Sequence, residues 1–323
     1  YILIKLNKVS KLMKNEPIII VAGEPYSVFL EIFFKSIKIN VFKKPIILIV
    51  SQELFTKQMK ALRYNLDFNV INEKTINFKK LSIKSINIIN VDLMIKNIFD
   101  KISKDSNIYI EKSFKIALNL IKKNRCTGLI NGPISKKHFL TGKFLGITEY
   151  LAAKMNKKNK VAMLIFNKKL SVSPITTHLP LKKVHKELSK KKIIKHVQLI
   201  KEFYKKKLNK NPRIAITGLN PHCESNYKSS EENLIIRPAI KYLIKKKHVV
   251  TGPFAADTIF MKDQLKNFDV IIGMYHDQVL TPAKTIFGFK AINITLGLPF
   301  IRISPDHGPN SKMLGKNLSS PES

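Results

Sequence analysis

The sequence predicts an α/β fold built around a mostly parallel sheet. Short apolar runs recur along the chain, most of them end in Gly, Pro or Asn, and stretches with helical spacing separate one run from the next. Buried parallel strands have this continuous apolar composition, and strands that alternate with helices indicate βα units. With 323 residues and 44% hydrophobic content, the chain can form one large or two ordinary domains.

Several apolar runs are expected to be strands, because they are rich in the Ile, Val and Leu that suit a sheet covered on both faces. They comprise residues 17–22, 45–50, 127–130, 161–166, 170–174, 213–217, 270–272 and 292–295. The runs at 161–166 and 170–174 are so close in the chain that we expect them to pair directly. Residues 65–92 contain short alternating runs that define no clear order of elements.

Stretches with helical spacing of apolar residues are expected between these strands. They comprise residues 29–37, 52–62, 112–123, a helix that starts within 146–150, and residues 184–207 and 234–246. In residues 112–123 the apolar side chains Ile116, Ala117, Leu120 and Ile121 fall on one stripe. Thr148 is expected to cap the helix that starts near it, because its hydroxyl can accept from a free backbone N–H.

The net charge of +36 is spread along the chain. Nucleic-acid-binding proteins concentrate Lys and Arg on one face or in a recognisable reading module. Here the lysines follow nearly the whole length, mostly on expected helices, so solvated helix faces are favoured over a polyanion-binding surface. A nucleic-acid partner is therefore disfavoured, although the charge would attract an anionic substrate such as a phosphate ester.

The chain has the features of a cytoplasmic protein. No apolar run approaches the roughly 18 residues that would indicate a membrane span. Without such a run we expect no membrane association. Residues 1–16 are rich in lysine and lack a long apolar segment with a small-residue cleavage site, so we expect no signal peptide. Two cysteines, Cys126 and Cys223, form no disulfide framework, which favours a reducing compartment.

Histidines at strand ends are the first candidate site residues. Those that directly follow strand-like runs are His178, His222, His276 and His307. The others lie among lysines and are expected at the surface: His138, His185, His196 and His248. Three imidazoles from different loops, at 178, 222 and 276, could bind one divalent metal ion and leave positions open for substrate. Taken one by one, structural histidines with ordinary hydrogen bonds remain the alternative.

Lys284, Asn293 and Arg302 would supply a cation, an amide and a guanidinium near the same region. This set suits a substrate with a carboxylate and a phosphate, since Arg pairs with both through two hydrogen bonds. The alternative for each residue alone is a solvent-facing charge or a hydrogen bond at a strand end. No GxGxxG, GxxxxGK[ST] or GxSxG occurs, which disfavours a Rossmann dinucleotide site, a P-loop and a nucleophile-elbow hydrolase.

A set of motifs in register along the chain resembles the 4-hydroxythreonine-4-phosphate dehydrogenase (PdxA) family of pyridoxal phosphate biosynthesis. The motifs are GEP at 23–25, NGPISK at 131–136, GITEYLA at 146–152, TTHLPL at 176–181, GLNPH at 218–222, GPFAADT at 252–258, MYHDQ at 274–278 and NITLGLPFIRISPDHG at 293–308. The match extends from about residue 17 to about residue 316. Ile147 stands where the family usually has His in GHTE, and HGPNSKMLGKN replaces HGTAxDIAGKG on the cofactor side.

This resemblance implies an isocitrate/isopropylmalate dehydrogenase-like α/β/α fold with two domains and an active site in the cleft between them. Residues 1–135 and 300–323 would form the first α/β domain. Residues 136–299 would form the second, which carries the metal site and the dimer interface. The fold binds NAD(P) without a Rossmann fingerprint. The resemblance also implies a homodimer with a shared active site, in which one of the three metal-binding histidines comes from the second subunit.

The resemblance also assigns roles to individual residues. The metal ligands fall on His178, His222 and His276. The substrate contacts fall on Thr148, Lys284, Asn293 and Arg302. The cofactor contacts fall on Asp306, His307 and Gly308. The catalytic candidates are Asp257 and Asp277, which could orient ligands or relay a proton, and Lys284, which could donate one.

The implied reaction is oxidation of 4-phosphooxy-L-threonine by NAD or NADP at its hydroxyl-bearing carbon, followed by decarboxylation of the resulting β-keto acid. One divalent ion (Zn, Mg or Co) would assist both steps. A threonate or erythronate 4-phosphate is the alternative substrate within the same fold. A non-catalytic remnant, including a basic nucleic-acid-binding one, is the alternative from another class.

Overall fold

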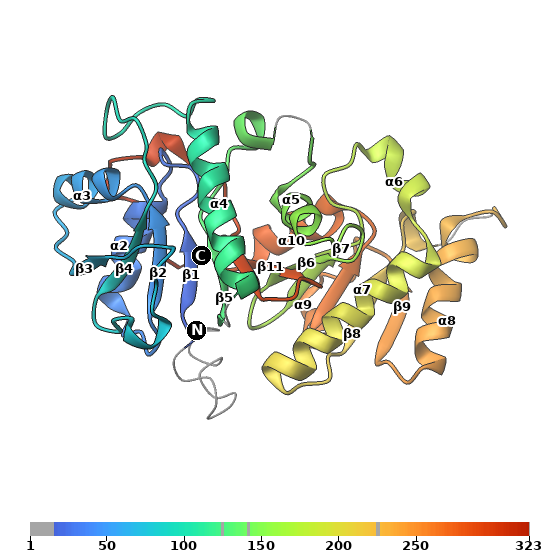
Figure 1. The fold of residues 1–323 in the computed structure, drawn as a ribbon. Helices are drawn as coiled ribbons and strands as arrows, with labels where there is room; N and C mark the ends of the chain where they lie inside the picture. The colour runs from blue at the N-terminus through green and yellow to red at the C-terminus, as the bar shows by residue number, and fades with distance from the viewer. Residues whose placement is uncertain (1–15, 124–125, 141–142, 224–226, 323) are drawn as a thin grey trace. The chain divides into compact units, whose positions relative to one another are not determined.

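The computed structural model describes residues 16–123, 126–140, 143–223 and 227–322 (Figure 1). The N-terminal stretch in which we expect no signal peptide lies almost entirely outside these ranges. The chain divides into two compact units, residues 1–147 with 299–323 and residues 148–298. No helix in the described part of the chain is both long and apolar enough to cross a membrane.

The first unit contains a parallel sheet in the order β3-β4-β2-β1-β5-β12. Its strands are β1 (Ile18–Val21), β2 (Ile46–Val50), β3 (Phe68–Val70), β4 (Ile86–Asn90), β5 (Gly128–Asn131) and β12 (Arg302–Pro305). Every residue of β1 and β2 is buried, as expected for central strands with helices on both faces. Because all pairs are parallel, the carboxyl ends of these strands lie at one edge.

The helices of the first unit are α2 (Phe29–Ile39), α3 (Gln52–Ala61), α4 (Ser106–Lys123) and short turns at Phe78–Lys80, Lys136–Leu140 and Ser311–Met313. An aromatic cluster joins α2 to α3, with the rings of Phe34 and Phe55 edge to face at 5.2 Å. Ser51 caps α3, because its hydroxyl accepts from the Leu54 amide at 3.3 Å. The expected helix at 112–123 begins earlier, at Ser106.

The second unit contains a mixed sheet in the order β11-β6-β7-β10-β8-β9. Its strands are β6 (Ala162–Phe166), β7 (Ser171–Pro174), β8 (Ile214–Thr217), β9 (Val250–Phe254), β10 (Val270–Gly273) and β11 (Ile292–Leu296). Strand β6 pairs with β7, as expected, and is antiparallel to both β7 and β11. Strands β7, β10, β8 and β9 are parallel neighbours, so the chain leaves all four at the same edge.

The helices of the second unit are α5 (Ile147–Lys154), α6 (Leu181–Glu187), α7 (Lys190–Phe203), α8 (Arg237–Lys245), α9 (Lys262–Leu265) and α10 (His276–Phe287), with short turns at Tyr204–Leu208, Pro221–Cys223 and Glu232–Ile236. Helices α7, α8 and α10 pack against the strands of this sheet. The predicted α/β fold class with a mostly parallel sheet is confirmed.

Three local expectations are wrong. The helix expected over 184–207 is two helices, because Leu188 is extended and the Ser189 hydroxyl accepts from the Lys192 amide to begin a new helix. Thr148 does not cap its helix, since the helix already includes Ile147. His196 is not a surface residue: it is 5% exposed and bonded to Ser173 at 2.8 Å, so burial lowers its pKa to about 3.

Candidate active site

Three candidate metal ligands leave one edge of the second unit's sheet. Strand β10 lies between β7 and β8, and the three strands are parallel. His276 follows β10, His178 follows β7 and His222 follows β8. The carboxyl edge of parallel strands is where open α/β sheets bind ligands. The topology therefore brings three loops with one imidazole each to a common edge.

His178 and His276 lie together at this edge. Their ring centres are 5.8 Å apart with 40° between the planes. On one tetrahedral zinc ion, with nitrogen–metal distances of about 2.0–2.1 Å, two imidazole centres lie roughly 5 Å apart. Nδ1 of His276 lies 2.6 Å from Oδ1 of Asp277. A carboxylate can only accept there, so Nδ1 carries the proton and Nε2 keeps its lone pair for a metal. These two imidazoles fit a shared divalent ion.

His222 is placed differently. It is exposed, and its backbone has φ 57°, in the left-handed region. Burial and the nearby carboxylates of Glu232 and Asp257 raise the pKa of the adjacent Cys223, which places Asp257 near this turn. In the described part of the chain, no three His, Cys, Asp or Glu side chains are arranged to hold one metal ion. Within one chain, the structure pairs His178 with His276, and the three-histidine site stays a prediction.

Gln278 is a site residue to which sequence reasoning gave no role. Its Oε1 accepts from the Thr217 hydroxyl at 2.9 Å and from the Met274 amide at 2.6 Å. Its Nε2 donates to the Gly218 carbonyl at 2.8 Å. This buried amide therefore ties the end of β8 to the end of β10 and holds the loops of two candidate ligands. The sequence feature that could have indicated this role is the position of Gln278 at the end of the MYHDQ motif, directly after His276 and Asp277.

Glu232 is a second residue that holds a loop of the site and to which sequence reasoning gave no role. Its Oε1 accepts from the amides of Leu219 at 2.7 Å and Asn220 at 2.9 Å. Its Oε2 accepts from the Asn220 side chain at 2.9 Å. The carboxylate is 1% exposed, and these bonds keep its pKa below the usual value despite burial. Glu232 thus shapes the loop before His222.

The expected substrate contacts of the second unit occupy α5, α10 and β11. Thr148 is buried, and its hydroxyl lies 3.4 Å from that of Thr295. Asn293 lies on β11 opposite Ile165, and its Oδ1 is shielded from solvent with no hydrogen bond among the described residues. Lys284 lies on α10 with its ammonium 4.9 Å from the centre of the Phe289 ring.

Arg302 belongs to the first unit and begins β12. Its side chain is completely buried, and its Nε donates to Oδ1 of Asn131 at 2.7 Å. Asn131 ends β5, the parallel neighbour of β12. A guanidinium is rarely fully buried unless it is paired, since its desolvation is costly. Asn131, in the NGPISK motif, therefore orients the arginine, a role that sequence reasoning did not assign.

The expected cofactor contacts follow β12 directly. Asp306 and His307 are half-buried, Gly308 is exposed, and Nδ1 of His307 lies 2.8 Å from the Gly308 carbonyl oxygen. A Cβ at Gly308 would meet no atom within 4 Å, so its backbone is open to a ligand.

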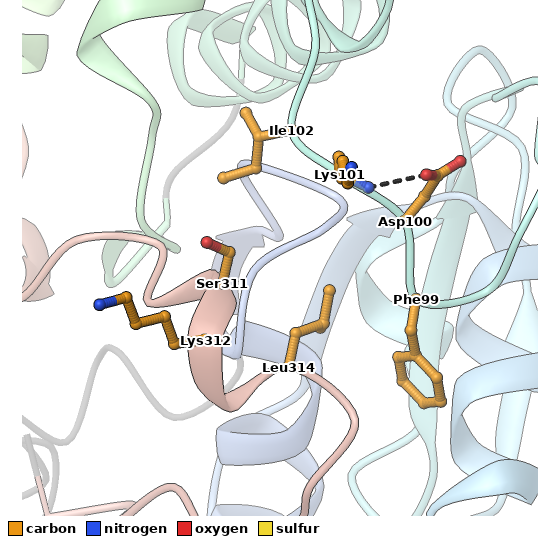
Figure 2. A pocket seen from close by; sticks show the side chains of 7 residues that line it. All are labelled: Phe99, Asp100, Lys101, Ile102, Ser311, Lys312 and Leu314. Atoms are coloured by element: carbon orange, nitrogen blue, oxygen red, sulfur yellow. Dashed lines mark hydrogen bonds between the residues drawn. The ribbon is translucent and has the colours of Figure 1, made fainter.

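A pocket of about 480 Å³ lies further along this segment, in the first unit (Figure 2). Residues 99–102, after β4, form one wall, and Ser311, Lys312 and Leu314, after β12, form the other. Its volume is in the range of pockets that bind small molecules, about 300–1,000 Å³. Both walls come from loops that follow parallel strands.

Comparison with known proteins identifies the family. The sequence model of the family described as pyridoxal phosphate biosynthetic protein PdxA matches residues 42–323. A curated 4-hydroxythreonine-4-phosphate dehydrogenase of Sulfurihydrogenibium sp. is 38% identical over 311 residues, which cover 94% of each chain. A putative D-threonate 4-phosphate dehydrogenase of Oceanobacillus iheyensis is 30% identical and covers 95% of this chain and 94% of its own.

Solved structures agree with the sequence comparison. The crystal structure of 4-hydroxythreonine-4-phosphate dehydrogenase from Klebsiella pneumoniae superposes with a TM-score of 0.77 at 26% identity and covers 95% of both chains. A terephthalate 1,2-cis-dihydrodiol dehydrogenase from Burkholderia xenovorans shares the fold, with a TM-score of 0.62 at 18% identity. The prediction of an enzyme of the dehydrogenase class is confirmed by the curated 4-hydroxythreonine-4-phosphate dehydrogenases and the family match. The chain therefore belongs to the PdxA family of pyridoxal phosphate biosynthetic proteins, as its motifs indicated.

Proposed function

We propose that this protein oxidises 4-phosphooxy-L-threonine with NAD or NADP and a divalent metal ion, and that decarboxylation of the keto acid follows, in pyridoxal 5'-phosphate biosynthesis. The observation that supports this most directly is the pair of imidazoles from His178 and His276 at the carboxyl edge of parallel strands, with the Asp277 carboxylate on the second ring. The relatives' names supply the substrate.

The metal would be held by His178, His222 and His276, with one of the three contributed by the second subunit of a homodimer. A bound divalent ion lowers the cost of removing the hydroxyl proton and polarises a ketone. The chain's own contribution is orientation: the Asp277 carboxylate keeps the proton of His276 on Nδ1. Asp257, near the His222 turn, and Asp277 remain the candidates for relaying a proton, and Lys284 the candidate donor.

Substrate anions would be bound by Arg302 and Lys284, with Thr148 and Asn293 as hydrogen-bonding partners. The buried guanidinium of Arg302 is held by Asn131, which reduces the entropy lost when it binds a carboxylate or phosphate. The open backbone at Gly308, with Asp306 and His307, fits the cofactor, whose nicotinamide accepts a hydride. The pocket in Figure 2 lies along the same segment and would take the nucleotide end.

The test is a reduced-cofactor assay. Purified protein is supplied with 4-phosphooxy-L-threonine, NAD or NADP, and Zn²⁺, Mg²⁺ or Co²⁺. We expect reduced nicotinamide to form, chelator to abolish it, and added metal to restore it. His178→Ala should lose bound metal, whereas His185→Ala, an exposed histidine on α6, should keep it. No turnover with any of the three metals would refute the proposal.

A threonate or erythronate 4-phosphate is the second candidate substrate. The Oceanobacillus relative, named as a putative D-threonate 4-phosphate dehydrogenase, supports it. The same assay with that compound separates the two. We further propose a cytoplasmic location, since Cys126 and Cys223 are both free thiols, as a reducing compartment permits.

A further inference from the structure

Glu149 has a carboxylate oxygen with no partner. The residue lies in the first turn of α5, between Thr148 and Tyr150. Its Oε1 accepts from the Thr177 hydroxyl at 3.2 Å, so it lies beside the loop that carries His178. Its Oε2 is shielded from solvent and makes no hydrogen bond with any described residue. A half-buried carboxylate normally uses all its oxygens, because an unsatisfied charged group is costly.

The other shielded acids of the second unit are fully engaged. Glu232 accepts from two amides and one side chain. Asp269 is bonded to Lys210 and Arg213 and is 8% exposed. The chain has 58 Lys and Arg residues against 22 Asp and Glu, so a cation for one more acid is easily supplied. Yet none of the described lysines, arginines or histidines pairs with Glu149.

Helix capping does not account for Glu149. An acid at the third position of a helix often reaches back to a free backbone N–H at the helix start. Here the oxygen that has a partner is bonded to a hydroxyl on another loop, and the second oxygen reaches no amide. The second oxygen therefore lacks a partner, and a bound ligand could supply one.

We propose that Glu149 binds the ammonium group of the substrate and thereby sets the preference for an amino acid phosphate over a hydroxy acid phosphate. This inference rests on the proposed function. 4-Phosphooxy-L-threonine carries an ammonium on the carbon next to its carboxylate, and threonate 4-phosphate carries a neutral hydroxyl there. The ammonium can donate a charge-assisted hydrogen bond to the desolvated carboxylate oxygen of Glu149. The neutral hydroxyl of threonate 4-phosphate cannot donate a bond of that kind.

The surroundings of Glu149 suit this role. Its neighbour in sequence, Thr148, is an expected substrate contact, and its bonding partner Thr177 precedes the candidate metal ligand His178. In the substrate the ammonium-bearing carbon adjoins the carbon that is oxidised. A group beside a metal-binding loop is therefore well placed to contact it.

The test compares Glu149→Gln with wild type on both phosphates. Glutamine can still accept from Thr177 but carries no charge. We expect kcat/KM for 4-phosphooxy-L-threonine to fall roughly 10- to 100-fold, mainly through KM, and its affinity measured by calorimetry without cofactor to fall similarly. The values for threonate 4-phosphate should change less than threefold. Glu202→Gln, which removes an exposed acid of α7, should match wild type on both compounds.

Three outcomes overturn the inference alone. An equal fall for both phosphates would mean that Glu149 only positions the Thr177–His178 loop, and unchanged kinetics for both would mean that it contacts neither. A wild-type enzyme that prefers threonate 4-phosphate would also refute it. Wild type that turns over neither phosphate would refute the proposed function, and this inference with it.

Discussion

Glu24 gives a prediction whose magnitude follows from the structure. The residue follows β1 in the first unit and is 1% exposed. Burial raises its pKa from 4.5 to about 7, although the Ser106 hydroxyl and the Tyr26 amide oppose the rise. The folded state therefore keeps a proton that the unfolded state has released above pH 4.5. The contribution of Glu24 to stability is full below pH 4.5 and is lost as pH rises to about 7.

The size of this loss follows from the two pKa values. Each pH unit between them costs roughly 1.4 kcal/mol, so the total is about 3 kcal/mol, a large fraction of the stability of an ordinary domain. Glu24→Gln keeps the shape of the side chain and removes the titration. Between pH 4.5 and pH 8, we expect the free energy of unfolding of the variant to rise by up to about 3 kcal/mol relative to that of wild type.

The measurement is urea unfolding of wild type and Glu24→Gln at pH 5, 6, 7 and 8. The difference between the two free energies of unfolding removes the titration of every other group. Glu53→Gln, an exposed acid of α3 in the same unit, is the control and should show a difference that is nearly independent of pH. A Glu24→Gln difference that is also flat across this range would refute the raised pKa and the burial argument behind it.

Three further predictions follow from the same structure. Burial lowers the pKa of His196 to about 3, so the folded state should lose about 1.4 kcal/mol per pH unit below 6.5; His196→Gln should show a shallower acid limb in urea unfolding, and equal limbs would contradict this. In Gly132→Ala the new Cβ would overlap the Ala22 carbonyl oxygen and lie 2.7 Å from the Phe29 ring, which should cost more than about 2 kcal/mol, measured by thermal unfolding; a stable variant would show that the backbone after β1 and the Phe29 ring can both shift. Asp277→Asn should weaken metal binding roughly 10- to 100-fold in a metal titration by releasing His276, and unchanged affinity would remove Asp277 from the site.

Much of the fold could be predicted because it is encoded locally. Residues 17–22 and 45–50 are continuous apolar runs, and burial on both faces makes such runs central strands, as β1 and β2 show. The division of 184–207 into two helices was missed, since apolar spacing and lysine content continue across the break. Only the extended Leu188 and the Ser189 cap interrupt it.

The candidate site, too, could be predicted only in part. Histidines that follow strands could be found in the sequence, because parallel strands release their following residues at one edge. Which imidazoles lie together could not, since the distance between His178 and His276 depends on the order β7-β10-β8, set by long-range pairing.

By itself, the sequence determined which chemical groups lie at strand ends and, through eight motifs in register, which family the chain belongs to. Only the tertiary structure decided the state of each polar group. His196 lies among lysines in the sequence yet is buried on Ser173, and Glu149 has one oxygen on Thr177 and one without a partner. Burial and hydrogen bonding depend on residues far away in the chain, so composition and spacing do not encode them.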